Sequence, residues 1–176
     1  VIFTISLADY NALLGSNLIA TNKTNVVLSF TDEFIKDTTG NPVMAAIDVP
    51  VHSFVPDETA PHLVAFELAN LHEGYITLSF NEPVDKMSVS WDAIVLMSTG
   101  NASTAVSYRL VDGETEFDLV DVEGGEAPKS RVIFHLDDDD RLFLASSDEL
   151  YTDIDSTWLI LDPNAILDLQ GNGIER

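Results

Sequence analysis

Alternation of apolar and polar positions is the dominant pattern along this chain. Within residues 75–80, for example, Ile76, Leu78 and Phe80 alternate with more polar residues. A two-residue period of this kind predicts a half-buried β-strand. The same pattern predicts further strands over 1–5, 26–30, 47–54, 63–68, 93–97, 105–110, 117–122, 131–136 and 157–161.

Two short helices interrupt the predicted strands. Ser6 is suited to N-cap a helix over 7–15, and Asp137 to N-cap a helix over 138–146. Acidic residues in the first helical turn also interact favourably with the positive end of the helix dipole. Turn signals rich in Gly, Asn and Pro separate the strands, which favours a mostly β fold with antiparallel connections.

The two ends of the sequence resemble each other at a fixed spacing. Val1-Ile2-Phe3 recurs as Val132-Ile133-Phe134, and Asp37-Thr38-Thr39-Gly40-Asn41 recurs as Asp168-Leu169-Gln170-Gly171-Asn172, both at an offset of 131 (132 − 1 and 168 − 37). Aligning 1–45 with 132–176 without gaps gives 12 identities. A constant offset over that length predicts a tandem repeat.

The repeat also predicts how the chain is organised. Residues 1–56 are interpreted as the C-terminal part of one unit, and 57–176 as the following unit, lacking its last strand. Pro56 and Pro61 bound a linker-like stretch between them, because each proline removes a backbone donor and restricts its neighbour. We therefore expect the sequence to be a window from a longer array.

Short motifs in this order resemble the bacterial-type Ig-like domains of surface-layer proteins and adhesins. The resemblance lies in Glu58-Thr59-Ala60-Pro61 before a strand, in Leu78-Ser79-Phe80-Asn81-Glu82-Pro83-Val84-Asp85, and in the Asp-x-x-Gly-Asn turn near the close. It implies Ig-like antiparallel β-sandwich repeats, here each with one inserted helix. Similar long repeats occur in very large extracellular proteins of marine protists and algae.

Charge and composition exclude several classes of function. The chain carries 30 Asp and Glu against 8 Lys and Arg, a formal net charge of −22, which disfavours binding to nucleic acid or to anionic membranes. No apolar run approaches the roughly 18 residues of a membrane span, so no membrane insertion is expected. The absence of cysteine excludes disulfides, thiolate metal sites and cysteine nucleophiles.

The Asp-x-x-Gly-Asn motif has two interpretations. As a tight turn, it uses the glycine for a left-handed backbone conformation. As the start of a Ca²⁺ loop, it would present the oxygens of Asp168, Gln170 and Asn172 at alternate positions. No bidentate glutamate follows at the twelfth position, so no cofactor is required by the motif and Ca²⁺ stays the alternative.

The acidic run at residues 137–140 also has two interpretations. A helix cap with a solvated first turn is the structural one. A weak divalent-cation site using Asp137 and Asp139 is the other, since carboxylates are the ligands Ca²⁺ prefers.

Other candidate sites are few. Asn22 and Asn101 begin Asn-x-Ser/Thr triplets, which are N-glycosylation acceptors in secreted eukaryotic proteins. Trp91 and Trp158 are candidates either for packing within a sheet or for stacking on sugars. The sequence has none of the common metalloprotease, esterase or phosphate-binding motifs, so no enzymatic activity is predicted.

The function predicted from the sequence is therefore mechanical. We expect a non-catalytic structural repeat of a large extracellular or cell-surface glycoprotein, forming part of a stalk, sheath or filament such as a flagellar-hair-like appendage. Its partners would be neighbouring repeats or copies of the same protein. The alternative is a Ca²⁺-dependent or glycan-binding adhesin module that recognises cell-surface glycans.

Overall fold

The protein is mostly β in a computed structural model that describes residues 2–16, 18–117 and 130–175. It forms two compact units, one of Ser16–Asp57 and one of Glu58–Arg176 together with Val1–Gly15. The chain passes from the first to the second between Asp57 and Glu58, within the proline-bounded stretch.

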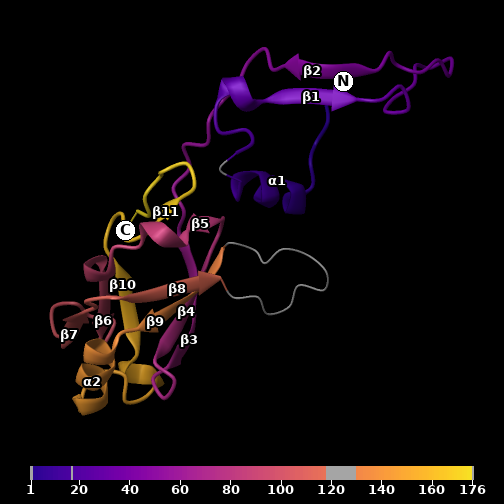
Figure 1. Ribbon diagram of the computed structural model, residues 1–176. Coiled ribbons are helices and arrows are strands. Elements are labelled where there is room, and N and C mark those ends of the chain that lie inside the picture. The colour runs from indigo at the N-terminus through magenta and orange to yellow at the C-terminus, as the bar shows by residue number, and fades with distance from the viewer. Residues whose placement is uncertain (1, 17, 118–129, 176) are drawn as a thin grey trace. The chain divides into compact units, whose positions relative to one another are not determined.

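The described residues of the unit Ser16–Asp57 form one pair of strands. Its strands β1 (Val27–Phe30) and β2 (Ala46–Pro50) run antiparallel, and a 3-10 turn at Lys23–Asn25 precedes β1 (Figure 1). The register of the pair shifts between Leu28 and Phe30.

The larger unit contains a four-stranded antiparallel sheet in the order β3-β4-β9-β8. Its strands, in chain order, are β3 (Leu63–Asn70), β4 (Tyr75–Phe80), β8 (Gly113–Phe117) and β9 (Arg131–Leu136). Gly74 makes the turn between β3 and β4 with a φ of 79°, a conformation that favours glycine. Strand β4 lies between β3 and β9, and the side chains of Ile76, Leu78 and Phe80 are buried on its inner face.

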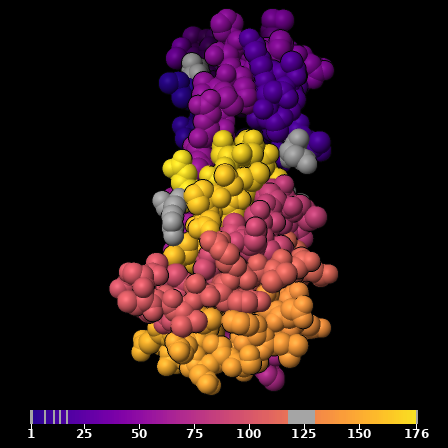
Figure 2. Space-filling model, turned by 90° about the vertical axis from the view of Figure 1, so that its left-hand side faces the viewer, coloured from indigo at the N-terminus to yellow at the C-terminus, as the bar shows by residue number. Residues whose placement is uncertain are grey.

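A three-stranded antiparallel sheet in the order β10-β6-β7 accompanies it. Its strands are β6 (Ile94–Met97), β7 (Ser107–Arg109) and β10 (Trp158–Leu161). A short ribbon joins β5 (Val84–Asp85) to β11 (Leu167–Asp168), and in the space-filling view the yellow C-terminal segment lies directly beside the β5 region (Figure 2).

One hydrophobic core joins the two larger sheets. Its members include Leu78 of β4 and Phe134 of β9 from the four-stranded sheet, and Leu96 of β6 and Leu161 of β10 from the three-stranded sheet. Burial alternates along β9: Val132, Phe134 and Leu136 point into this core, whereas the intervening residues are only partly covered. Burial of apolar surface at this interface is the main stabilising contribution in the larger unit.

Both predicted helices form, and each begins at the expected cap. Helix α1 covers Leu7–Leu14, with the Ser6 hydroxyl oxygen accepting the Asp9 backbone N–H at 3.1 Å. Helix α2 covers Asp138–Ser146, with the Asp137 carboxylate accepting the Asp140 N–H at 2.8 Å.

The predicted strand over 1–5 is wrong for the residues described there. Residues 2–5 have no strand structure, although their counterparts in β9 pair with both β4 and β8. An extended segment becomes a strand only when a neighbour supplies hydrogen-bond partners for its backbone. Alternation of apolar residues alone could not reveal that such a neighbour is missing.

Several other strand bounds differ from prediction. The strand over 105–110 shortens to β7, and that over 47–54 becomes β2. The predicted strand over 117–122 is described only at its first residue, where β8 ends, and its remainder lies outside the described residues. Strands β5 and β11 were not predicted, because two residues are too few to show a period.

Local geometry recurs at the spacing that the sequence showed. The helices α1 and α2, the 3-10 turns at Lys23–Asn25 and Ile154–Ser156, and the strands β1 and β10 each begin 131 residues apart (138 − 7, 154 − 23 and 158 − 27).

Unusual backbone conformations recur at the same spacing. Ala20 and Tyr151 are non-glycine residues with φ of 57° and 58°, and Gly40 and Gly171 have φ of 90° and 91°. A positive φ is uncommon for residues other than glycine, so its recurrence at matched positions reflects the same local fold. The isolated bridges Lys36↔Pro42 and Leu167↔Gly173 match as well.

Matched positions differ greatly in burial, which gives a direct test. Leu136 of β9 is 6% exposed, whereas its counterpart Ile5 is 50% exposed. We expect Leu136→Ala to lower the free energy of unfolding by about 2–5 kcal/mol, because it leaves a cavity in the core. Ile5→Ala, the matched control, should change it by less than about 0.5 kcal/mol. Denaturant unfolding measures both, and equal effects at the two positions would contradict the assignment of the core.

Candidate functional site

The Asp168 turn is closed by hydrogen bonds within the turn itself. The Oδ1 atom of Asp168 accepts the backbone N–H groups of Gln170 and Asn172, each at 2.8 Å, and Oδ2 accepts the Asn172 side-chain amide at 2.7 Å. The carboxylate is 4% exposed. The structure thus brings Asp168, Gln170 and Asn172 together in the hydrogen-bonding pattern of a tight turn.

The matching turn at Asp37 uses the same bonds. Its Oδ1 accepts the N–H groups of Thr39 and Asn41, each at 2.9 Å, and its Oδ2 accepts the Asn41 amide at 2.8 Å. Hydrogen bonds from the Asn41 side chain and backbone, and from Thr39, hold the pKa of the Asp37 carboxyl well below its ordinary value. Both turns therefore use an aspartate carboxylate as the acceptor that organises the loop.

The acidic residues at the start of α2 lie elsewhere in the larger unit. Asp137 caps the helix and Asp139 is exposed on its first turn. Asp168 is the last residue of β11, and this strand lies well away from α2 (Figure 1). Within residues 2–16, 18–117 and 130–175, no three His, Asp or Glu side chains are grouped as metal ligands. The structure does not unite the two sets of candidate cation ligands.

Asp140 is a buried carboxylate that the sequence analysis did not single out. It is fully buried, accepts the Tyr108 hydroxyl at 2.8 Å, and accepts the Val111 backbone N–H at 3.1 Å through Oδ2. These bonds anchor α2 to β7 and to the segment that follows it. The only signal in the sequence is that Asp9, at the matched position, is the same residue.

Tyr108 completes this anchor. Its ring stacks on Phe143 of α2 with the two centroids 3.9 Å apart. Removal from water, followed by the hydrogen bond to the Asp140 carboxylate, raises the pKa of Tyr108 to about 12. The neutral phenol is therefore favoured, and it donates its hydrogen bond to the buried Asp140 side chain.

The two glycosylation candidates are exposed and structured alike. The side-chain oxygen of Asn22 accepts the Thr24 N–H, and that of Asn101 accepts the Ser103 N–H at 3.2 Å and its hydroxyl at 2.7 Å. Both asparagines lie on the surface. Each triplet is therefore a local turn in which the hydroxyl residue is held against the asparagine.

The two tryptophans pack against other parts of the larger unit. Trp91 meets Phe134 edge to face, with centroids 5.8 Å apart. Trp158 is 48% exposed, and a Cβ atom at Gly100 would come within 2.9 Å of its ring. The Trp158 indole N–H also donates to the Asp155 carbonyl at 2.8 Å, which fixes the ring.

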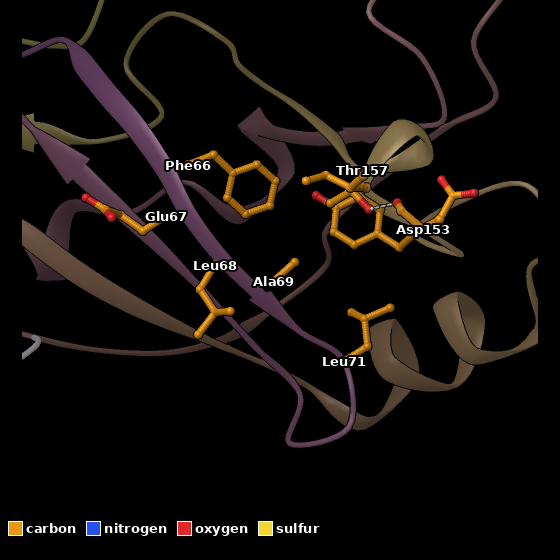
Figure 3. Close-up of a pocket in the computed structure, with 9 residues that line it drawn as sticks. Phe66, Glu67, Leu68, Ala69, Leu71, Asp153 and Thr157 are labelled. Atoms are coloured by element: carbon orange, nitrogen blue, oxygen red, sulfur yellow. Dashed lines mark hydrogen bonds between the residues drawn. The ribbon is translucent and has the colours of Figure 1, made fainter.

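A groove of about 400 Å³ lies between β3 and the turn before β10. Figure 3 shows the ring of Phe66 facing the Asp153–Thr157 turn, with Leu71 near its far end. Its lining includes the carboxylates of Glu67 and Asp153 but no histidine, lysine or serine. Among the described residues around this groove, no nucleophile is paired with a base, so its chemistry does not suggest a reaction.

Comparisons with protein-family models, with curated proteins and with solved structures each found no match to this chain. The longest helix of the described residues has nine residues, well below the length that would cross a bilayer. A function is therefore inferred from the residues of this chain and from their geometry.

The Asp140 anchor can be tested by removing its phenol donor. We expect Tyr108→Phe to lower the free energy of unfolding by about 1–3 kcal/mol, because a buried carboxylate loses a hydrogen bond while the ring stays in place. Tyr75→Phe is the matched control, since the Tyr75 hydroxyl bonds to none of the described residues. Thermal or denaturant unfolding measures both, and an equal loss in the two variants would refute the anchor.

Proposed function

We propose that this chain is a non-catalytic structural repeat of a large extracellular protein. Each complete repeat is an Ig-like antiparallel β-sandwich with one inserted helix, and neighbouring repeats or copies of the protein are its partners. The recurrence of local geometry at a spacing of 131 residues is the observation that carries this proposal.

The hydrogen bonds of the recurring turns support the repeat. Asn22 and Asn25 form a capping box around the first 3-10 turn, and Asp153 and Ser156 form one around the second. Different side chains thus make the same bonds at matched positions. A duplicated fold explains this recurrence because each copy must satisfy the same backbone groups.

The sheet arrangement supports the Ig-like part. A four-stranded and a three-stranded antiparallel sheet share one core, which is the division of strands in constant-type Ig domains. Helix α2 and the β5-β11 ribbon are additions to that plan.

The surface chemistry supports a mechanical role. A net charge of −22 keeps an extended chain soluble and favours separation between units through mutual repulsion. The described carboxylates with firm structural roles, Asp37, Asp140 and Asp168, bond to neighbouring donors within the fold. Such bonds stiffen a unit, which suits a stalk, sheath or filament such as a flagellar-hair-like appendage.

Calcium binding distinguishes this role from that of a Ca²⁺-dependent adhesin. After treatment with EGTA, we expect titration of the chain to about 1 mM Ca²⁺ to give no saturable heat, because the Asp168 oxygens already accept hydrogen bonds. The melting temperature should rise no more than with Mg²⁺ at the same ionic strength, since both ions screen the charge equally. Calorimetry and thermal melting provide the measurement.

The contrary result is a saturable calcium heat that Asp168→Ala abolishes and Asp92→Ala, an unrelated acidic residue, preserves. That outcome would favour the adhesin module over the structural repeat.

A further inference from the structure

Residues of the Ser16–Asp57 unit are exposed where their counterparts in the larger unit are buried. Ile19 is 55% exposed, whereas the matched Leu150 is 1% exposed. Leu28 is 54% exposed, whereas the matched Leu159 packs against the core. Both positions are apolar in both copies, so the side chains of the first copy are suited to the same buried contacts as those of the second.

The second copy is covered because β10 pairs with β6. Trp158 lies opposite Met97, and Leu161 lies opposite Ile94, in an unbroken antiparallel register. Strand β1, at the position matched to β10, pairs only with β2 among the described residues. The second copy therefore has the complete strand pair, β10 with β6, whereas the first copy has only β1, the counterpart of β10.

The backbone identifies which edge of β1 is open. Asp162 donates its N–H to the Ala93 carbonyl at 2.8 Å, so Trp158 and Ile160, at alternate positions, direct their backbone groups towards β6. Their counterparts in β1 are Val27 and Ser29.

Strand β2 lies on the other edge. Val51 donates its N–H to the Val26 carbonyl at 3.1 Å, so Val26 and Leu28 direct their backbone groups towards β2. Val27 and Ser29 therefore face away from β2, towards the edge that β6 occupies in the other copy. We call this edge, together with Ile19 and Leu28, the β1 face.

Charge limits what can approach this face. Two molecules that each carry a net charge of −22 repel each other, and contact through neutral segments adds least to that repulsion. Residues 24–31, which contain β1, include no charged side chain, and neither do residues 93–108, which contain β6. The β6 segment is thus a partner whose approach adds no like-charge contact.

A second position points to the same partner. The buried Asp140 receives hydrogen bonds from Tyr108 and Val111, which follow β6 along the chain. Its counterpart Asp9 is exposed and bonds to the Ser6 hydroxyl at 2.7 Å. Among the described residues, Asp9 therefore has no hydrogen bonds that match those from Tyr108 and Val111 to Asp140.

We propose that the β1 face binds strand β6 of a second copy of this chain, in the register that β6 adopts with β10. Strand addition of this kind supplies backbone hydrogen bonds along the edge and covers the apolar side chains beside it. The inference rests on the repeat in the proposed function and names its partner surface. Within an array, this β6 strand would come from the stretch of chain that directly precedes the repeat segment containing β1.

The test is an extended chain in which a second copy of residues 57–131 stands directly before Val1. Because residue 131 normally precedes the segment that matches residue 1, this fusion preserves the register of the repeat. Hydrogen exchange of the Val27 and Ser29 amides is the readout. We expect exchange at both to slow by about 100-fold or more relative to the original chain, since closed strand pairs protect their amides.

Two variants of the extended chain distinguish specific pairing from general crowding. Val95→Pro in the added copy removes a backbone donor of β6 and should restore fast exchange. Leu28→Asp should do the same by placing a charge on the β1 face. Ile47→Asp, at an 80% exposed position of β2, should leave the protection unchanged.

A second measurement does not require the extension to fold. A peptide of residues 91–111, added to the isotope-labelled original chain, should shift the NMR signals of Val27–Phe30, and the same peptide with Val95→Pro should not. Unchanged exchange in the extended chain, or equal effects of the two peptides, overturns the proposal. Either result leaves the calcium test of the structural role unaffected, so the two failures are distinguishable.

Discussion

Pairing of β10 with β6 is the interaction on which the larger unit depends. It closes one edge of the three-stranded sheet and places Leu161 and Leu96 in the core that also holds Phe134 of the other sheet. Burial of these side chains and satisfaction of the strand edge occur together, because a single register fixes both. The matched strand β1 pairs only with β2 among the described residues, and its Val27 and Leu28 side chains lie exposed.

Local turns do not depend on that partner. The Asp37 and Asp168 turns have the same bonds and nearly the same glycine φ, although one aspartate is exposed and the other is buried. Short-range hydrogen bonds between residues two to four apart therefore specify these turns without help from the core. The chain thus separates structure that is encoded locally from structure that requires pairing between distant strands.

This separation also explains how much the sequence could predict. The helix caps at Ser6 and Asp137 and the strand over 75–80 were predicted because their signals lie within a few residues. The pairing of β5 with β11 and the hydrogen bonds that bury Asp140 involve residues far apart in the chain, so no local sequence pattern predicts them. The calcium interpretation of Asp168 depended on where its oxygens point, which spacing alone does not fix.

The most direct test of a tandem repeat is the coding sequence on both sides of these 176 residues. A further match to the apolar pattern of residues 63–117, placed 131 residues before its position here, is the result that the account predicts. A counterpart of β2 directly after Arg176 is predicted as well. Flanking sequence with no relation to either segment at that spacing would contradict the tandem repeat.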